Sequence, residues 1–301
     1  YNNMYDPSEV PKPIRRESLE DEDRQHPLLK MLHELIPRSF FFNDKLIEPA
    51  ALMSDLDVLQ ARATYYGIMS QVDHHLGRVI NYLKKSGQYE STLIIFTSDH
   101  GEQLGDHYSF GKSGYFDQSY YIPLIIRTPE IAKQSSEESV VRGTQVELFT
   151  EAIDVMPTIL DWLETEIPEE CDGRSLLPFL KGKIPDNWRT EVHWEYDFRQ
   201  IGSFQPMIEQ QFGLSPDQCS LTVLRDEHYK FVHMTALKPL LFDLQKDPEE
   251  FINLANDPRY QDIMLKYTQK MLSWQMLHRD RTLVNMNMES GNLVNWKGPR
   301  I

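Results

Sequence analysis

The sequence predicts an α/β fold, in which a layered α/β/α core precedes a smaller antiparallel sheet and helix. Three patterns support this fold class. A long helical pattern covers residues 55–85, a β-branched run at 92–97 follows it, and shorter alternating segments appear after about residue 184. Helix followed directly by strand is typical of layered α/β domains. We therefore expect residues 1–185 to form the core, and 186–301 a smaller unit with a tail.

The segment ahead of the long helix, residues 1–50, is rich in proline and charge and predicts an extended surface arm, with a short helix at 27–35. The first residues show neither an initiator Met nor a targeting segment, so we expect the chain to continue a longer polypeptide. In residues 55–85, apolar side chains such as Met69, Val72, Leu76 and Val79 recur three and four positions apart, and Gly87 follows. This spacing predicts an amphipathic helix that stops at a glycine.

The apolar run 92–97, which shows no alternation, predicts a strand buried on both faces of a parallel sheet, and 122–127 predicts a second strand of the buried type. Pro123 is tolerable because it lies near the start of its strand. The polar segment 133–142 predicts a loop, and 146–149 a short strand. A helix is expected over 154–163, where Pro157 fits the first turn.

The alternating segment 192–198 predicts a strand, and 221–224, 229–233 and 239–243 predict further strands of a small antiparallel sheet. His193, Glu195 and Asp197 share one face of the first strand; they could form a second metal site, or simply face solvent. Asp257 and a following proline predict a helix start, and the apolar face of that helix is expected to pack on the sheet. A tail from about residue 280 could wrap a neighbouring copy in a homo-oligomer.

The composition narrows the classes of partner. Lys and Arg number 31 against 46 Asp and Glu, giving a net charge of −15, which argues against nonspecific binding to nucleic acid or to an anionic membrane. No apolar run approaches the roughly 18 residues that cross a bilayer. Two cysteines, Cys171 and Cys219, are too few for a disulfide framework, and we expect free buried thiols. The cellular compartment stays open.

A candidate site follows the strand at 92–97, because open α/β sheets bind ligands at the carboxyl ends of their strands. Asp99 and His100 stand there side by side, and their oxygen and nitrogen donors suit a divalent cation. The alternative is that Asp99 caps a turn and His100 is an ordinary loop residue. Lys112, on a glycine-rich loop, would bring a positive charge back to this strand end, where it could hold an anionic ester.

These residues resemble a known family. The segment 96–107, FTSDHGEQLGDH, and the later pairs Gly111-Lys112 and Phe116-Asp117 are similar to the second metal-binding motif of sulfatases and phosphonate monoester hydrolases in the alkaline phosphatase superfamily. The likeness extends over most of the chain, from residue 1 to about 274. It implies an alkaline-phosphatase-like α/β/α core that is only partial here, and a hydrolase that acts on small anionic esters.

The resemblance implies roles for four residues. Asp99 and His100 would be metal ligands, and Lys112 would contact a non-bridging oxygen of the substrate and act in catalysis. His107 lies at a family position near the pocket, where we expect it to contact substrate; a structural role in the loop is the alternative. The metal implied is one divalent ion, Ca²⁺ as is usual in sulfatases or Mn²⁺ as suits the phosphonate branch.

The nucleophile that the resemblance implies is a formylglycine, made from Cys or Ser in a Cys/Ser-x-Pro/Ala-x-Arg motif. Neither Cys171 nor Cys219 stands in such a motif, so we expect the nucleophile in a missing N-terminal part and predict that this chain alone is inactive. Other readings are a noncatalytic folded fragment that acts in binding or oligomer contacts, and a phosphatase or mutase with a Ser or Thr nucleophile. Whether sulfur or phosphorus is the natural centre stays open, with a lean towards phosphonate monoesters.

Overall fold

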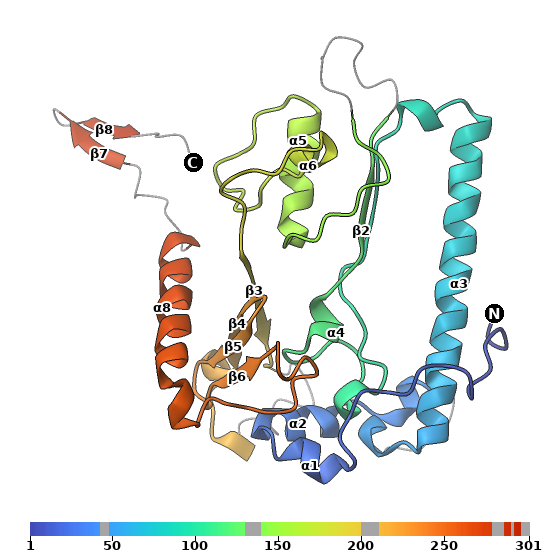
Figure 1. Cartoon of the computed structure of the whole chain (residues 1–301), viewed down its shortest axis with the longest axis vertical. Helices are drawn as coiled ribbons and strands as arrows, with labels where there is room; N and C mark the ends of the chain where they lie inside the picture. The colour runs from blue at the N-terminus through green and yellow to red at the C-terminus, as the bar shows by residue number, and fades with distance from the viewer. Residues whose placement is uncertain (43–47, 130–139, 200–210, 279–285, 290–291, 296–301) are drawn as a thin grey trace. The chain divides into compact units, whose positions relative to one another are not determined.

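A computed structural model describes residues 1–42, 48–129, 140–199, 211–278, 286–289 and 292–295 (Figure 1). Its backbone divides into two compact units, Tyr1–Asn256 and Asp257–Ile301, and each is described by itself. The four-stranded sheet expected for the C-terminal part lies in the first unit. A functional division at residue 186 stays a prediction.

The N-terminal arm carries two short helices, α1 (Leu19–Asp23) and α2 (Pro27–Leu35). Helix α2 confirms the predicted bounds. The Nδ1 atom of His26 accepts a hydrogen bond from the amide of Leu28 at 3.1 Å, and Pro27 takes the first helical position, where its missing N–H costs nothing. One face of α2 is then buried. Two 3₁₀ turns, η1 (Arg38–Phe40) and η2 (Ala50–Leu52), follow.

The long helix α3 (Asp55–Lys85) confirms the amphipathic prediction. The side chain of Ser54 accepts a hydrogen bond from the amide of Asp57, and acidic residues in the first turn and basic residues in the last turn complement the helix dipole. Gly87, with φ +73°, ends the helix in the left-handed region. A short turn, η3 (Tyr89–Ser91), joins α3 to the first strand.

The two apolar runs form β1 (Ile94–Thr97) and β2 (Leu124–Arg127), which confirms two strands, but the parallel sheet predicted for the first run is not what the described residues form. The strands pair antiparallel, with Thr97 opposite Leu124. The connection between them, residues 98–123, holds a 3₁₀ turn, η4 (Asp106–Tyr108), and a single-turn helix, α4 (Asp117–Tyr120), but not the longer helix that usually links two parallel strands. The residues of both strands are half-buried or exposed. The predicted burial of the strands on both faces is therefore not found among the described residues.

The next segment forms η5 (Ala152–Asp154), α5 (Val155–Trp162) and α6 (Leu177–Leu180). Helix α5 confirms the expected helix with Pro157 in its first turn. Residues 146–149 are not a strand, because they pair with no described strand; the exposed side chain of Val146 agrees with a surface segment. The predicted polar loop at 133–142 lies largely outside the described residues.

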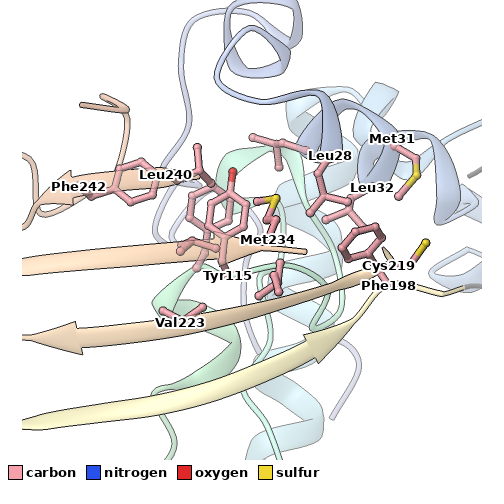
Figure 2. Close-up of a cluster of buried hydrophobic side chains, with 14 of the residues drawn as sticks. Leu28, Met31, Leu32, Tyr115, Phe198, Cys219, Val223, Met234, Leu240 and Phe242 are labelled. Atoms are coloured by element: carbon pink, nitrogen blue, oxygen red, sulfur yellow. The ribbon is translucent and has the colours of Figure 1, made fainter. Parts of the chain in front are cut away.

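Four strands form an antiparallel sheet in the order β3 (Glu191–Asp197), β4 (Ser220–Asp226), β5 (Tyr229–Met234) and β6 (Leu240–Asp243), which confirms the predicted small sheet. A 3₁₀ turn, η6 (Pro216–Gln218), precedes β4. The main hydrophobic core joins Leu28, Met31 and Leu32 of α2 to Tyr115 and to inward side chains of the sheet (Figure 2). The core therefore fixes the loop around residue 115 between the N-terminal arm and the sheet.

The second unit consists of η7 (Pro258–Tyr260), α8 (Gln261–His278), and the paired strands β7 (Met286–Glu289) and β8 (Asn292–Asn295). The side chain of Asp257 accepts a hydrogen bond from the amide of Arg259 and caps the first turn, as predicted. Tyr267 and Met271 are buried, on the face expected to be apolar. Packing of that face on the sheet, and a role of the tail in oligomers, stay predictions.

A search of the described residues finds no helix whose length and hydropathy would let it cross a bilayer. Both cysteines are free thiols, with Cys219 buried and Cys171 half-buried. The expectation of free thiols is therefore confirmed, and the expectation of burial is confirmed in full only for Cys219.

Candidate functional site

The strand β1 ends at Thr97, and the turn that follows presents Asp99 and His100. The hydroxyl of Ser98 donates to the carbonyl oxygen of His100 at 2.7 Å, and the amide of His100 donates to Oδ1 of Asp99 at 3.0 Å. These two hydrogen bonds stabilise the turn formed by residues 98–101. The two side chains are thereby held next to each other at the carboxyl end of the strand.

The imidazole of His100 is oriented as a metal ligand would be. Its Nδ1 lies 2.7 Å from the carbonyl oxygen of Gly101, which can only accept a hydrogen bond, so Nδ1 carries a proton and the neutral ring has its lone pair on Nε2. Nε2 lies 3.6 Å from Oδ2 of Asp99. Two donors at this separation can both reach one ion at ligand distances of about 2.0–2.4 Å. A metal-binding histidine commonly donates its second ring N–H to a carbonyl, as here.

Asp99 is open to a ligand, since its side chain is 84% exposed. Its pKa lies below the usual value: desolvation raises it, but the charge of His100, two backbone amides and the charge of Lys112 together lower it by more. Asp99 is therefore ionised at neutral pH. Within the part of the chain that the structure describes, no group of three or more His, Cys, Asp or Glu side chains gathers to hold a metal, so the pair supplies two donors and His193, Glu195 and Asp197 do not assemble a second site.

Lys112 is exposed, but the loop that carries it is fixed on both sides. Oε1 of Glu102 accepts hydrogen bonds from the amides of Gly111, at 2.5 Å, and Leu104. On the other side, the side chain of Tyr196 bonds that of Ser113. Hydrogen bonds therefore hold the residues on both sides of Lys112. Lys112 lies near enough for its charge to contribute to the lowered pKa of Asp99.

Gly101 ties this turn to α4 by a close backbone approach. Its amide donates to the carbonyl oxygen of Ser119 at 2.8 Å, and a Cβ atom at this position would lie 2.0 Å from the carbonyl oxygen of Gln118. Only glycine fits this contact. Helix α4 is itself held by Asp117, whose carboxylate meets Arg225 and the fully buried Lys230 of the sheet. The site therefore rests on the four-stranded sheet through α4.

His107 lies in a different environment from Asp99 and His100. Its side chain has no exposed surface, its Nδ1 lies 2.9 Å from Oε1 of the equally buried Glu22, and its ring stacks on Phe116 at 3.7 Å. Its backbone has φ +51°, in the left-handed region, and its carbonyl oxygen accepts a hydrogen bond from Nε2 of His33. These contacts favour the structural alternative. A contact between His107 and substrate stays an untested prediction.

The Glu22–His107 pair should make stability depend on pH. Burial raises the pKa of Glu22, but the hydrogen bond and charge of His107 lower it by more, aided by the amide and charge of Arg16, so the folded-state pKa lies below the usual value. A carboxyl with a lowered pKa contributes stability above its unfolded pKa and loses it as the pH falls through the folded one. We expect Glu22→Gln to lower the free energy of unfolding by about 2 kcal/mol at pH 7.

This deficit should shrink as the pH falls below the ordinary glutamate pKa of about 4.3. Urea unfolding at neutral and acidic pH measures it. Glu20→Gln is the matched control, since Glu20 belongs to the same helix but is 79% exposed and pairs only at the surface. An equal deficit for Glu22→Gln at both pH values would contradict the pair's ionisation.

Sequence patterns did not single out Glu102, Gly101 or the Asp117–Lys230 contact as supports of the site. Glu102 directly follows the Asp-His-Gly run. Its place next to a glycine-rich loop, whose amides a carboxylate can bind, is the one local signal that could have indicated its role. Lys230 stands in a strand, where a lysine is expected to face solvent. Its partners are distant in sequence, so no local pattern could identify them.

The chain matches two protein-family profiles. A profile described as Sulfatase matches residues 3–165, and one described as N-sulphoglucosamine sulphohydrolase, C-terminal, matches residues 105–276. The second profile begins inside the loop that carries Lys112 and extends through the four-stranded sheet and α8. Together the profiles cover both the candidate site and its support.

Individual proteins of known family are also similar to this chain. The chain is 50% identical over 285 residues to the multifunctional alkaline phosphatase superfamily protein PehA of Trinickia caryophylli, a match that covers 95% of this chain and 54% of that protein. Among solved structures, the phosphonate monoester hydrolase of Agrobacterium radiobacter has a TM-score of 0.89 at 41% identity, covering 99% of this chain and 57% of that one. The enzyme from Silicibacter pomeroyi gives 0.87 at 38% identity, covering 98% and 56%.

The fold is therefore the α/β fold of alkaline-phosphatase-like hydrolases, as predicted. Within that class the chain belongs to the sulfatase family, whose profile matches more than half of its length. It spans about half the length of the relatives that it matches: 54% of PehA and 57% of the Agrobacterium enzyme.

Proposed function

We propose that this chain is the part of a metal-dependent hydrolase that supplies two metal ligands and a substrate-binding lysine. The substrates proposed are sulfate esters, phosphonate monoesters or phosphodiesters. The carrying observation is the arrangement of His100, with Nδ1 bonded to a carbonyl and Nε2 3.6 Å from Asp99, beside the charge of Lys112. Membership of the sulfatase family supports the reaction class.

In this proposal Asp99 and His100 hold one divalent cation, and the carbonyl oxygen of Gly101 keeps the ring of His100 in the ligating tautomer. The cation, when bound, supplies Lewis-acid stabilisation of the anionic group. Lys112 binds a non-bridging oxygen and offsets the charge that grows there during the reaction. The remaining ligands and a formylglycine nucleophile would come from polypeptide that this chain does not contain.

The relatives favour the phosphorus branch. PehA is described as a multifunctional superfamily protein, and the two structures above are phosphonate monoester hydrolases, at 38–50% identity across the three. By contrast, the arylsulfatase of Clostridium perfringens is 26% identical. We propose phosphonate monoesters or phosphodiesters as the first substrates to test, and Mn²⁺ ahead of Ca²⁺ as the metal to supply.

A noncatalytic fragment is the second candidate. The observation that favours it is that the described residues provide two donors and no larger metal-binding group. On either proposal, the chain by itself should bind metal weakly and turn over no ester. Hydrolysis by the isolated chain that Asp99→Ala abolishes would contradict this expectation.

The metal site can be tested by metal analysis of a complete protein that contains this chain. We expect Asp99→Ala and His100→Ala each to weaken divalent-metal affinity by at least about tenfold, because each removes a donor. Asp73→Ala is the matched control, an exposed aspartate on α3. If both site variants retain the metal content and affinity of the unaltered protein, the metal is held elsewhere and the proposal is wrong.

A further inference from the structure

Two tyrosine side chains hold residues 111–114, the segment that carries the substrate-binding lysine and is here called the lysine loop. The hydroxyl of Tyr120 donates to the carbonyl oxygen of Gly114 at 2.9 Å, and the side chain of Tyr196 bonds that of Ser113. Tyr120 belongs to α4 and Tyr196 to β3. Two separate elements therefore bind the two residues that directly follow the lysine.

Glycines at both ends of the lysine loop give these bonds their importance. Gly111 has φ +75° and Gly114 has φ +101°, both in the left-handed region. Glycine allows the backbone many other conformations, so the loop's own sequence does not define where Lys112 lies. At the first end of the loop, the amide of Gly111 donates to Glu102. At the second end, the two tyrosines supply the contacts.

The tyrosine rings are in turn placed by the four-stranded sheet. The ring of Tyr120 stacks on that of Trp194, with centroids 4.7 Å apart and planes inclined by 22°. Nζ of the buried Lys230 lies 5.4 Å from the ring centroid of Trp194. Tyr196 stands two residues further along β3, on the same face of the strand, and Trp194 and Tyr196 both pack against the main hydrophobic core. The bonds to the lysine loop therefore come from side chains that the sheet and the core hold in place.

Both phenols keep their protons near neutral pH. Burial raises the pKa of Tyr120, and the neighbouring Tyr196 raises it further. Burial also raises the pKa of Tyr196, although the bond to Ser113 lowers it in part. Neither hydrogen bond is therefore lost by ionisation in the pH range where ester hydrolysis would be measured.

We propose that Tyr120 and Tyr196 are positioning residues, which hold the lysine loop so that Lys112 meets the anionic group bound beside Asp99 and His100. This inference rests on the proposed function, because the lysine needs a defined position only if it acts on substrate. In this proposal neither tyrosine contacts the substrate, and both act through Lys112. Position matters because stabilisation of developing charge depends on preorganised groups, and a misplacement of about 1 Å can cost about 10²-fold in rate.

Kinetics of hydroxyl deletions in a complete protein test the proposal. Tyr196→Phe keeps the ring and removes the bond to the loop, and we expect it to lower kcat/KM for a phosphonate monoester by about tenfold, mainly through kcat. Tyr120→Phe combined with Tyr196→Phe should lower it further. Tyr5→Phe is the matched control, because it removes the hydroxyl from another tyrosine–serine bond, to Ser70 at 2.8 Å, and should leave kcat/KM unchanged.

A double-mutant cycle distinguishes positioning from a general structural role. In the Lys112→Ala background, Tyr196→Phe should cause no further loss of kcat/KM, because the tyrosine acts through the lysine. A variant that merely lowered the amount of folded protein would reduce the activity of both backgrounds by the same factor. Equal losses in the two backgrounds would therefore overturn the proposal.

Hydrogen exchange tests the contact without relying on activity. In the complete protein, residues 111–116 should exchange at least about threefold faster in Tyr196→Phe than in the unaltered protein, and at the unaltered rate in Tyr5→Phe. Unchanged exchange in Tyr196→Phe would overturn the inference and leave the proposed function standing. If the unaltered complete protein hydrolyses none of the esters, the proposed function is wrong, and the exchange of residues 111–116 still decides whether Tyr196 holds the loop.

Discussion

Replacement of Lys112 by alanine in a complete protein is expected to lower kcat/KM for an anionic ester by about 10²–10³-fold, the usual effect of removing one preorganised group that stabilises developing charge. The neighbours of Lys112 are held on both sides, because the amide of Gly111 donates to Glu102 and the side chain of Ser113 bonds that of Tyr196. The loop should therefore persist in the variant. Because the lysine is exposed, we expect a change of less than about 0.5 kcal/mol in the free energy of unfolding.

Steady-state kinetics with a phosphonate monoester and a sulfate ester measure this loss. Lys85→Ala is the matched control, an exposed lysine in the last turn of α3. Lys112→Arg should recover part of the activity, because it keeps the charge but changes its shape and reach. Metal content should stay at the unaltered level in Lys112→Ala. A variant that retains full kcat/KM on both esters would remove Lys112 from the reaction.

Local patterns were sufficient for much of the fold. Helices α2 and α3 and the four strands β3–β6 lie where periodicity and capping residues place them, because each carries its own signal in a few consecutive residues. The antiparallel pairing of β1 with β2 differs from the parallel sheet that the run at 92–97 predicts. An apolar, β-branched run predicts that a strand is buried on both faces, but it does not predict the direction of the neighbouring strand. The described residues do not bury both faces of β1 and β2.

The candidate site shows the same division. Asp99, His100 and Lys112 were identifiable because residue type and order carry their chemistry. The structure places Asp99 beside His100, and the charge of Lys112 contributes to the lowered pKa of Asp99. The environment of His107 was not, because its partner Glu22 lies 85 residues earlier in the chain. Distant contacts of this kind decide whether a histidine faces a pocket or the interior, and they appear only once the chain is folded.

The buried cluster around Lys230 explains how the sheet supports the site. The ammonium group, with no exposed surface, contacts Oδ1 of Asp117 at 2.5 Å, the carboxylate of Glu250, and the carbonyl oxygen of Tyr115 at 3.2 Å. Burial raises the pKa of Asp117, but Lys230 and Arg225 outweigh it, so that pKa lies below the usual value. For Glu250, burial dominates and raises the pKa despite the attraction of Lys230. The lysine therefore joins two carboxylates of unequal acidity.

Lys230→Met is accordingly expected to lower the free energy of unfolding by about 3–5 kcal/mol at pH 7, because it leaves carboxylates buried without their cation. Arg225 still pairs with Asp117, so most of the lost stability should come from the unpaired carboxylate of Glu250. The pKa of Glu250 should then rise further, and a carboxyl with a raised pKa loses stability as the pH rises through that value. The deficit should therefore be smaller in acid, and smaller at pH 7 in Lys230→Met combined with Glu250→Gln.

Chemical unfolding at two pH values measures both effects, with Lys246→Met as the matched control. Lys246 pairs with Asp243 at 2.6 Å, but its side chain is 70% exposed, so its loss should cost less than about 1 kcal/mol. A deficit for Lys230→Met as small as the control's would show that the cluster does not hold α4. If the deficit is large, the same variant of a complete protein should also lose activity, because α4 positions the turn of Asp99 and His100 through Gly101.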